Sequence, residues 1–186
     1  MTTANIITVA RVLMIPIFYV FAIKTGAVYE AVAIAIFIIA SITDAIDGHI
    51  ARKMHQVTNF GKFMDPLADK LLVMTALLIF VGQDIMPAWA AVIILAREFV
   101  VTSLRMVAAV DGVVIQASRW GKMKTLIHML GISFLLLRLH PISLGGTVTL
   151  QDLIILAMVL ISVCSGINYV RKNVSVIKDG FTQRGS

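Results

Sequence analysis

The chain has 186 residues, of which 59% are hydrophobic and only 14% are charged, and its mean hydropathy is +0.95. A soluble domain would carry about 25% charged residues, so the composition argues against a soluble domain and favours a helical membrane protein. The net charge of +6 does not indicate a nucleic-acid partner, because basic residues facing anionic lipid headgroups account for it.

Six apolar segments follow one another along the chain, each near the roughly 20 residues that a bilayer-spanning helix needs. They cover approximately residues 6–23, 27–47, 63–81, 85–108, 123–138 and 150–170. No long linker or low-complexity tract separates them. We therefore expect an all-α integral membrane protein with six transmembrane helices, forming a single membrane domain over residues 1–186.

The basic residues predict the orientation of these spans. The loops near 48–62 and 105–124 and the C-terminal tail carry eleven Lys and Arg residues, whereas the loops on the opposite side carry only Lys24 and Arg138. Basic residues concentrate on the cytoplasmic side of membrane proteins. Both termini are therefore predicted to be cytoplasmic.

An acidic motif lies at the end of the second span, within "SITDAIDGHIARKMHQVTNFGKFMDPLADK", residues 41–70. If the second helix continues through it, Asp44, Asp47, Gly48 and Ala51 fall at i, i+3, i+4 and i+7 and share one face. That face would carry two carboxylates followed by two residues with almost no side chain.

The third span carries a second acidic stripe, because Gly61, Asp65 and Asp69 fall at i, i+4 and i+8. If the two faces meet, four carboxylates converge beside an open space. Their mutual repulsion in a low dielectric requires a compensating cation. Oxygen ligands suit Mg²⁺ or Mn²⁺, and two such ions about 4 Å apart are a familiar arrangement for chemistry on phosphates.

A structural role for these acids is the alternative, with each aspartate capping a helix or pairing with Arg52 or Lys70. One carboxylate at mid-bilayer costs on the order of 3 kcal/mol, and acids inside membrane spans are usually functional. Four acids on two aligned faces favour a functional site.

The fourth span contains the consecutive charges Arg97 and Glu98. Neighbouring helical residues do not share a face, so we expect no direct pair between them, although either can bond across helices. Thr102 and Arg105 follow Glu98 at i+4 and i+7 on its own face.

The acidic motif reads D-x2-D-G-x2-A-R-x8-G-x3-D-x3-D and resembles, without departure, the signature of the CDP-alcohol phosphatidyltransferase family. The segments "NIITVAR", "GKFMDPLADKLLV", "AREFVVTSLR" and "GKMKT" resemble one branch, the bacterial phosphatidylglycerophosphate synthases. The resemblance covers most of the chain and is weaker after residue 130.

This resemblance implies a homodimer of six-helix subunits in the bacterial plasma membrane, with a polar cavity open to the cytoplasmic leaflet. It implies transfer of a phosphatidyl group from CDP-diacylglycerol to sn-glycerol 3-phosphate, which gives phosphatidylglycerophosphate and CMP. Mg²⁺ or Mn²⁺, as two ions, is the implied cofactor, and membrane lipids surround the protein.

The resemblance also assigns roles to individual residues. The metal ligands would be Asp44, Asp47, Asp65 and Asp69, and Asp69 would also be the general base. The residues around the cytidine nucleotide would be Asp47, Gly48, Ala51, Arg52 and Gly61. Asn5, Thr8 and Arg11, spaced at i, i+3 and i+6, either reach the nucleotide or form a polar entry turn in which Arg11 extends to the interface.

Glycerol 3-phosphate carries a dianionic phosphate that needs basic partners. We expect Thr102, Arg105 and Lys124 to bind this phosphate, and Arg119 and Lys122 are further candidates. The alternative is that these charges are ordinary basic residues of a cytoplasmic loop.

Other functions remain open at this stage. Within the family, inositol phosphate or serine could be the acceptor, because the signature does not encode the acceptor. A membrane prenyltransferase would place its acids in a different pattern, and a divalent-cation transporter would not need Gly48, Ala51 and Gly61 at these spacings.

Overall fold

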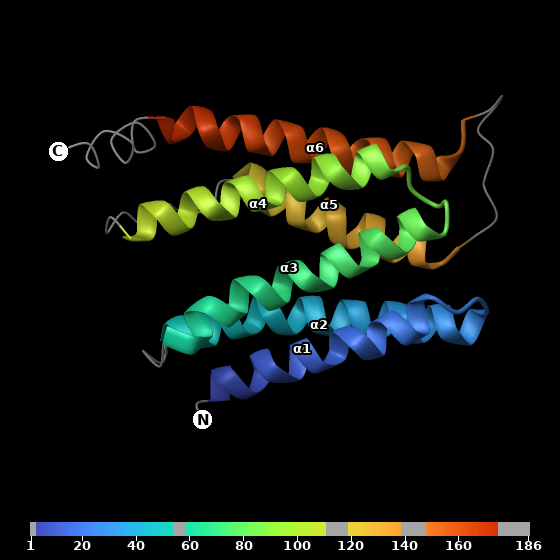
Figure 1. Ribbon diagram of the computed structural model, residues 1–186, viewed down its shortest axis with the longest axis horizontal. Helices are drawn as coiled ribbons and strands as arrows, with labels where there is room; N and C mark the ends of the chain where they lie inside the picture. The colour runs from blue at the N-terminus through green and yellow to red at the C-terminus, as the bar shows by residue number, and fades with distance from the viewer. Residues whose placement is uncertain (1–2, 54–58, 111–118, 139–147, 175–186) are drawn as a thin grey trace. The chain divides into compact units, whose positions relative to one another are not determined.

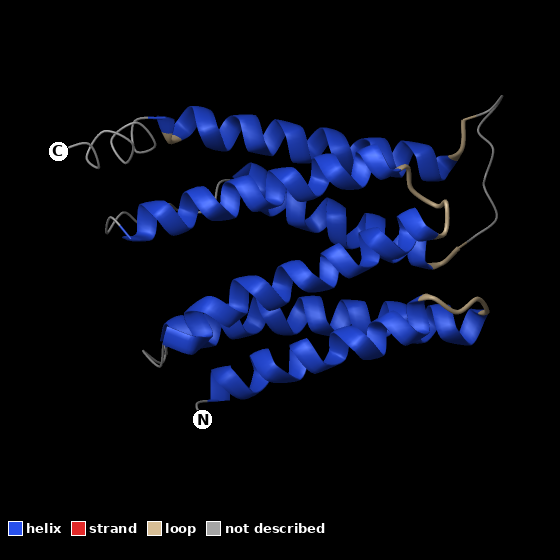
Figure 2. Ribbon diagram, in the orientation of Figure 1, coloured by secondary structure: helices blue, strands red, loops and turns tan. Residues whose placement is uncertain are grey.

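The computed structural model describes the backbone of residues 3–53, 59–110, 119–138 and 148–174, and the side chains of residues 9–43, 70–109, 119–138 and 148–174. The described part contains helices and no strand (Figures 1 and 2). The helices are α1 (Thr3–Ala22), α2 (Ala27–Lys53), α3 (Asn59–Gly82), α4 (Ala88–Val110), α5 (Arg119–Leu136) and α6 (Leu150–Lys172). The prediction of six helices is confirmed, with bounds that differ from the apolar segments by a few residues.

Length and composition identify one described helix that could cross a membrane. Among the residues whose side chains are described, α6 is the one helix both long and apolar enough, and the described residues of α1, α2 and α3 include the shorter apolar stretches Val9–Ala22, Ala27–Thr43 and Lys70–Gly82. Six transmembrane spans therefore stay a prediction.

The chain divides into two compact units. The first comprises Met1–Met86 and Ile132–His140, and the second comprises Pro87–Gly131 and Pro141–Ser186. The prediction of one membrane domain is not tested by this division and stays a prediction.

In the first unit, α1 packs against both α2 and α3, which also contact each other. The rings of Phe18 and Phe37 are tilted with centroids 6.0 Å apart, and both side chains are fully buried. The chain reverses between α1 and α2 at Gly26, whose φ of 129° is accessible to glycine at little cost. The start of α1, the end of α2 and the start of α3 consequently lie at the same end of this unit (Figure 1).

The opposite end of the first unit is tied together by Arg138. Its guanidinium donates hydrogen bonds to the carbonyl oxygens of Ala22 and Lys24, the latter at 3.0 Å, and to Gln83 Oε1 at 2.7 Å. Gln83 Nε2 in turn donates to the carbonyl of Ile23 at 3.3 Å. One residue that follows α5 therefore binds the ends of α1 and α3.

The second unit contains α4, α6 and the part of α5 up to Gly131, with α4 packed against α6. Two glycines permit close approach there. A Cβ added at Gly131 would lie 2.5 Å from Met158 Sδ, and one at Gly166 would lie 3.1 Å from Arg97 Cγ. Helix α6 begins with a capping box, in which Thr149 and Asp152 each bond the other's backbone N–H.

Candidate functional site

The acidic positions of α2 continue the buried stripe of that helix. Ala33, Phe37 and Ala40 are buried, at i, i+4 and i+7. Because α2 is helical through Lys53, Asp44 and Asp47 occupy positions i+11 and i+14 of the same stripe. The expectation that the second helix extends through the motif is therefore confirmed.

The acidic positions of α3 precede the buried stripe of that helix. Leu72, Ala76 and Phe80 are buried at intervals of four residues. Asp69 lies seven residues before Ala76, and Asp65 lies seven residues before Leu72. Two turns separate the members of each pair, so the acids fall on the same helical face as the buried residues.

These positions also lie at similar depths in the first unit. At 1.5 Å rise per residue, Asp44 and Asp47 lie about 14 and 9 Å before the end of α2, and Asp65 and Asp69 lie about 9 and 15 Å after the start of α3. Arg11 lies about 12 Å after the start of α1 and is buried, only 3% exposed. This burial argues against the alternative in which Arg11 extends to the interface.

Most of the predicted metal and nucleotide side chains lie outside the described part. They belong to Asn5, Thr8, Asp44, Asp47, Gly48, Ala51, Arg52, Gly61, Asp65 and Asp69, all of which are placed in helices by their backbone. Among the side chains that are described, no group of three or more His, Cys, Asp or Glu residues could hold a metal ion. The ligand roles of the four aspartates stay predictions.

The second unit holds a buried charge cluster. Glu98 Oε2 accepts a hydrogen bond from Lys124 Nζ and lies 3.4 Å from Arg97 Nη1. The side chains of Arg97, Glu98 and Lys124 are only 12%, 13% and 10% exposed. The expected bond across helices is confirmed, since Glu98 belongs to α4 and Lys124 to α5.

The expectation that Arg97 and Glu98 do not pair is wrong. Their Cβ atoms point about 100° apart around the helix, but both side chains are long enough to bend towards a common point. The Glu98 carboxylate bonds Lys124 of α5, and the Arg97 side chain reaches the same carboxylate. The Arg97 stem also packs closely on Gly166 of α6.

The remaining acceptor-site candidates are more accessible. Thr102 is half-buried and Arg105 is exposed, with its guanidinium carbon 5.4 Å from the centre of the Tyr169 ring. Arg119 and Lys122 are exposed on the first turn of α5. The structure thus separates one buried cation, Lys124, from a set of accessible ones.

A buried polar contact in α5 and α6 was not predicted from the sequence. His128 Nε2 lies 3.2 Å from both Ser162 Oγ and the carbonyl oxygen of Met158, and all three residues are buried. His128 follows Lys124 by one turn, and Ser162 directly follows the apolar run of residues 153–161 in α6. Those two spacings are the only sequence signals that could have indicated the contact.

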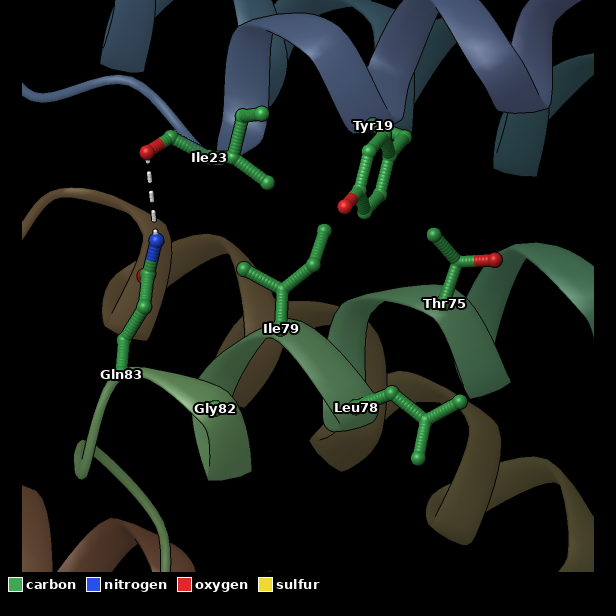
Figure 3. A pocket seen from close by; sticks show the side chains of 7 residues that line it. All are labelled: Tyr19, Ile23, Thr75, Leu78, Ile79, Gly82 and Gln83. Atoms are coloured by element: carbon green, nitrogen blue, oxygen red, sulfur yellow. Dashed lines mark hydrogen bonds between the residues drawn. The ribbon is translucent and has the colours of Figure 1, made fainter.

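The first unit also has an open groove of about 650 Å³ near the ends of α1 and α3. Figure 3 shows Tyr19 and Ile23 of the α1 side facing Thr75 and Ile79 of α3, and Leu78 also lines the groove. Gly82 and Gln83 complete its lining. The lining is mostly apolar, and the groove lies away from the start of α3, where the acidic motif is found, so we assign it no part in the chemistry.

Comparison with known proteins decides the family. The model of the CDP-alcohol phosphatidyltransferase family matches residues 1–166. The chain belongs to the CDP-alcohol phosphatidyltransferase family. The matched region includes every candidate site residue, from Asn5 to Lys124.

Individual members of the family are similar over most of their length. A Bacillus subtilis protein named CDP-diacylglycerol–glycerol-3-phosphate 3-phosphatidyltransferase is 43% identical, with 94% of this chain and 96% of the relative aligned. A Rickettsia typhi protein of the same name is 39% identical over 72% of this chain and 75% of the relative. A Mycobacterium tuberculosis protein named probable phosphatidylglycerophosphate synthase is 38% identical over 91% of this chain and 80% of the relative.

Proposed function

We propose that this member of the CDP-alcohol phosphatidyltransferase family transfers the phosphatidyl group of CDP-diacylglycerol to sn-glycerol 3-phosphate. The products are phosphatidylglycerophosphate and CMP, a step of phospholipid biosynthesis. Support comes from the names of relatives that match nearly the whole chain and from the family signature over residues 44–69.

The observation that carries the proposal is the placement of the acidic positions. Asp44 and Asp47 continue the buried stripe of α2, and Asp65 and Asp69 extend that of α3. Both helices pack on α1, and their acidic positions lie at similar depths from the same end of the unit. Carboxylates on these positions would repel one another if they met at one interior place, and bound cations would compensate that repulsion.

The donor set fits Mg²⁺ or Mn²⁺, because both ions prefer carboxylate oxygens. Asp44, Asp47, Asp65 and Asp69 would hold the ions. When bound, the ions would compensate the charge of the pyrophosphate and stabilise the departing CMP.

The nucleotide would lie beside the same stripe. Gly48, Ala51 and Gly61 leave room for the backbone and the ligand to approach each other. Asp47 and Arg52 would contribute polar contacts from α2, and Asn5 and Thr8 would do so from the first turns of α1.

Asp69 would act as the general base. Its carboxylate accepts the proton of the acceptor hydroxyl as that oxygen attacks the β-phosphorus, the one esterified to diacylglycerol. The bond between this phosphorus and the CMP oxygen breaks, and CMP leaves with the electron pair. Positioning of the hydroxyl supplies the rest of the rate enhancement.

The acceptor phosphate would be bound by Thr102, Arg105 and Lys124, with Arg119 and Lys122 as further cations. A hydroxyl and two cations match the oxygens and the charge of a phosphate dianion. Lys124 is the buried member of this set and Arg105 the exposed one.

We further propose that the protein is a multi-pass protein of the bacterial plasma membrane with six spans, both termini and the active site at the cytoplasmic side, and that it forms a homodimer surrounded by lipid. The distribution of basic residues supports this orientation. Large apolar side chains are exposed on every helix, as a lipid-facing surface requires, including Leu13, Val28, Leu78, Val92, Leu130 and Leu160. The contact of Arg138 with Lys24 joins the two basic residues predicted for the outer side.

Release of CMP from CDP-diacylglycerol by the purified protein tests the function. We expect release with glycerol 3-phosphate and none with inositol phosphate, serine or buffer alone. Release with inositol phosphate or serine instead would assign another acceptor within the family. Absence of CMP with every acceptor would reject the transferase and leave the divalent-cation transporter to be tested in vesicles.

A further inference from the structure

The Glu98 carboxylate of α4 is the meeting point of two cations from different helices. Its Oε2 atom accepts from Lys124 Nζ of α5 and lies 3.4 Å from Nη1 of Arg97. All three side chains are nearly buried. An ammonium group in such surroundings is stable only next to an anion, because desolvation of a charge costs several kcal/mol.

Glu98 determines where the Lys124 ammonium lies. A lysine side chain has four flexible methylene groups and by itself occupies many positions. The Glu98 carboxylate is held on α4 and paired with Arg97. Its contact with the Lys124 ammonium therefore restricts that group to one position. Arg97 is fixed in turn, because its aliphatic stem packs closely on Gly166 of α6. A Cβ added at Gly166 would lie only 3.1 Å from Arg97 Cγ.

The place where Glu98 holds Lys124 is next to the other acceptor-site candidates. Thr102 and Arg105 follow Glu98 at i+4 and i+7, so the three share one face of α4. Tyr169 of α6 faces Arg105 at 5.4 Å. The ammonium group has three N–H donors, so its bond to Glu98 is compatible with a contact to a phosphate oxygen.

We propose that Glu98 is a positioning residue, whose carboxylate holds the Lys124 ammonium beside the Thr102–Arg105 face for the phosphate of the acceptor. This inference rests on the proposed function, in which Lys124 binds that phosphate. Glu98 itself does not touch the substrate, and its effect is transmitted through Lys124.

A double-mutant cycle tests the inference. Glu98→Gln, Lys124→Gln and the double variant are purified, and the KM of each substrate and kcat are measured. Lys124→Gln should raise the KM for glycerol 3-phosphate roughly 10- to 150-fold, which corresponds to loss of one charge-assisted contact. Glu98→Gln should raise the same KM at least about 10-fold, with a much smaller effect on the KM for CDP-diacylglycerol. The double variant should be no worse than Lys124→Gln.

Two further variants separate positioning from a structural role. Asp152→Asn removes a carboxylate that caps α6 and touches none of these side chains, and it should leave both KM values unchanged. Glu98→Asp keeps the charge on a shorter side chain and should raise the acceptor KM less than Glu98→Gln. If Glu98→Gln does not fold, the comparison of Glu98→Asp in the presence and absence of Lys124→Gln provides the same cycle.

The wild-type enzyme is first assayed with each acceptor, so that the two failures are distinguishable. No CMP release with any acceptor would remove the proposed function and the inference with it. Normal activity with glycerol 3-phosphate would leave the proposed function intact. The inference alone would then be overturned if the two single variants multiply their effects on the acceptor KM in the double variant. It would also be overturned if Glu98→Gln raises both KM values equally or leaves the acceptor KM unchanged.

Discussion

Replacement of Arg138 by alanine should destabilise the protein strongly without a direct effect on catalysis. The guanidinium donates three hydrogen bonds, to the carbonyls of Ala22 and Lys24 and to Gln83 Oε1. A hydrogen bond from a charged group contributes about 1.5–3 kcal/mol, but such contributions are not additive, and water replaces part of them after the mutation. We therefore expect a loss of about 2–4 kcal/mol in the free energy of unfolding.

The charge and the backbone of Arg138 are separable contributions. A cation near the end of α1 also interacts favourably with the helix dipole, by about 0.3–1 kcal/mol, so Arg138→Lys should retain part of the stability. The backbone φ of 44° is unfavourable for any residue with a Cβ, so Arg138→Gly should be about 1 kcal/mol more stable than Arg138→Ala.

Reversible unfolding in mixed detergent micelles, followed by circular dichroism, measures these differences. Arg171, exposed in the last turn of α6, provides the matched control, and Arg171→Ala should change the stability by less than about 0.5 kcal/mol. The kcat of folded Arg138→Ala should stay near that of the wild type. If Arg138→Ala lowers the free energy of unfolding by less than about 1 kcal/mol, or by no more than Arg171→Ala does, the stabilising role of Arg138 is refuted.

Four further predictions concern packing, chemistry and topology. Gly131→Val should destabilise the protein by about 1–3 kcal/mol, because even a Cβ would lie 2.5 Å from a buried methionine sulfur. The control is Gly82→Ala, whose added Cβ has nothing within 4 Å. Equal stabilities of the two variants would contradict the packing argument. Chelation of divalent ions should abolish CMP release and Mg²⁺ or Mn²⁺ should restore it, whereas full activity in excess chelator would end the metal hypothesis. Asp69→Asn should fold and bind CDP-diacylglycerol but lose at least about 100-fold in kcat, and rescue by excess Mg²⁺ would assign Asp69 as a ligand rather than the base. Labels at position His140 and at the C-terminus should react from opposite sides of the membrane, and reaction from the same side would reject the predicted orientation.

The sequence alone was sufficient for the helices and for the register of the acidic motif. Helix positions follow from runs of apolar residues, and the spacing of Asp44 and Asp47 becomes a shared face once α2 continues to Lys53. These properties depend on residues within a few turns of one another, so a single sequence contains them. The family signature is local in the same sense.

The tertiary structure decided which helical faces are buried and which distant side chains meet. The stripe of Ala33, Phe37 and Ala40 identifies the inward face of α2, which the hydrophobic pattern of a nearly all-apolar helix does not reveal. The pair of Glu98 and Lys124 spans 26 residues of sequence, and the bond of Arg138 to Lys24 spans 114. Such contacts depend on how separate helices pack, and in a chain whose helices are apolar on most sides many packings satisfy the same sequence pattern. The physical reason is that hydrophobic periodicity specifies each helix separately, whereas the few buried charges pair only after the helices have packed together.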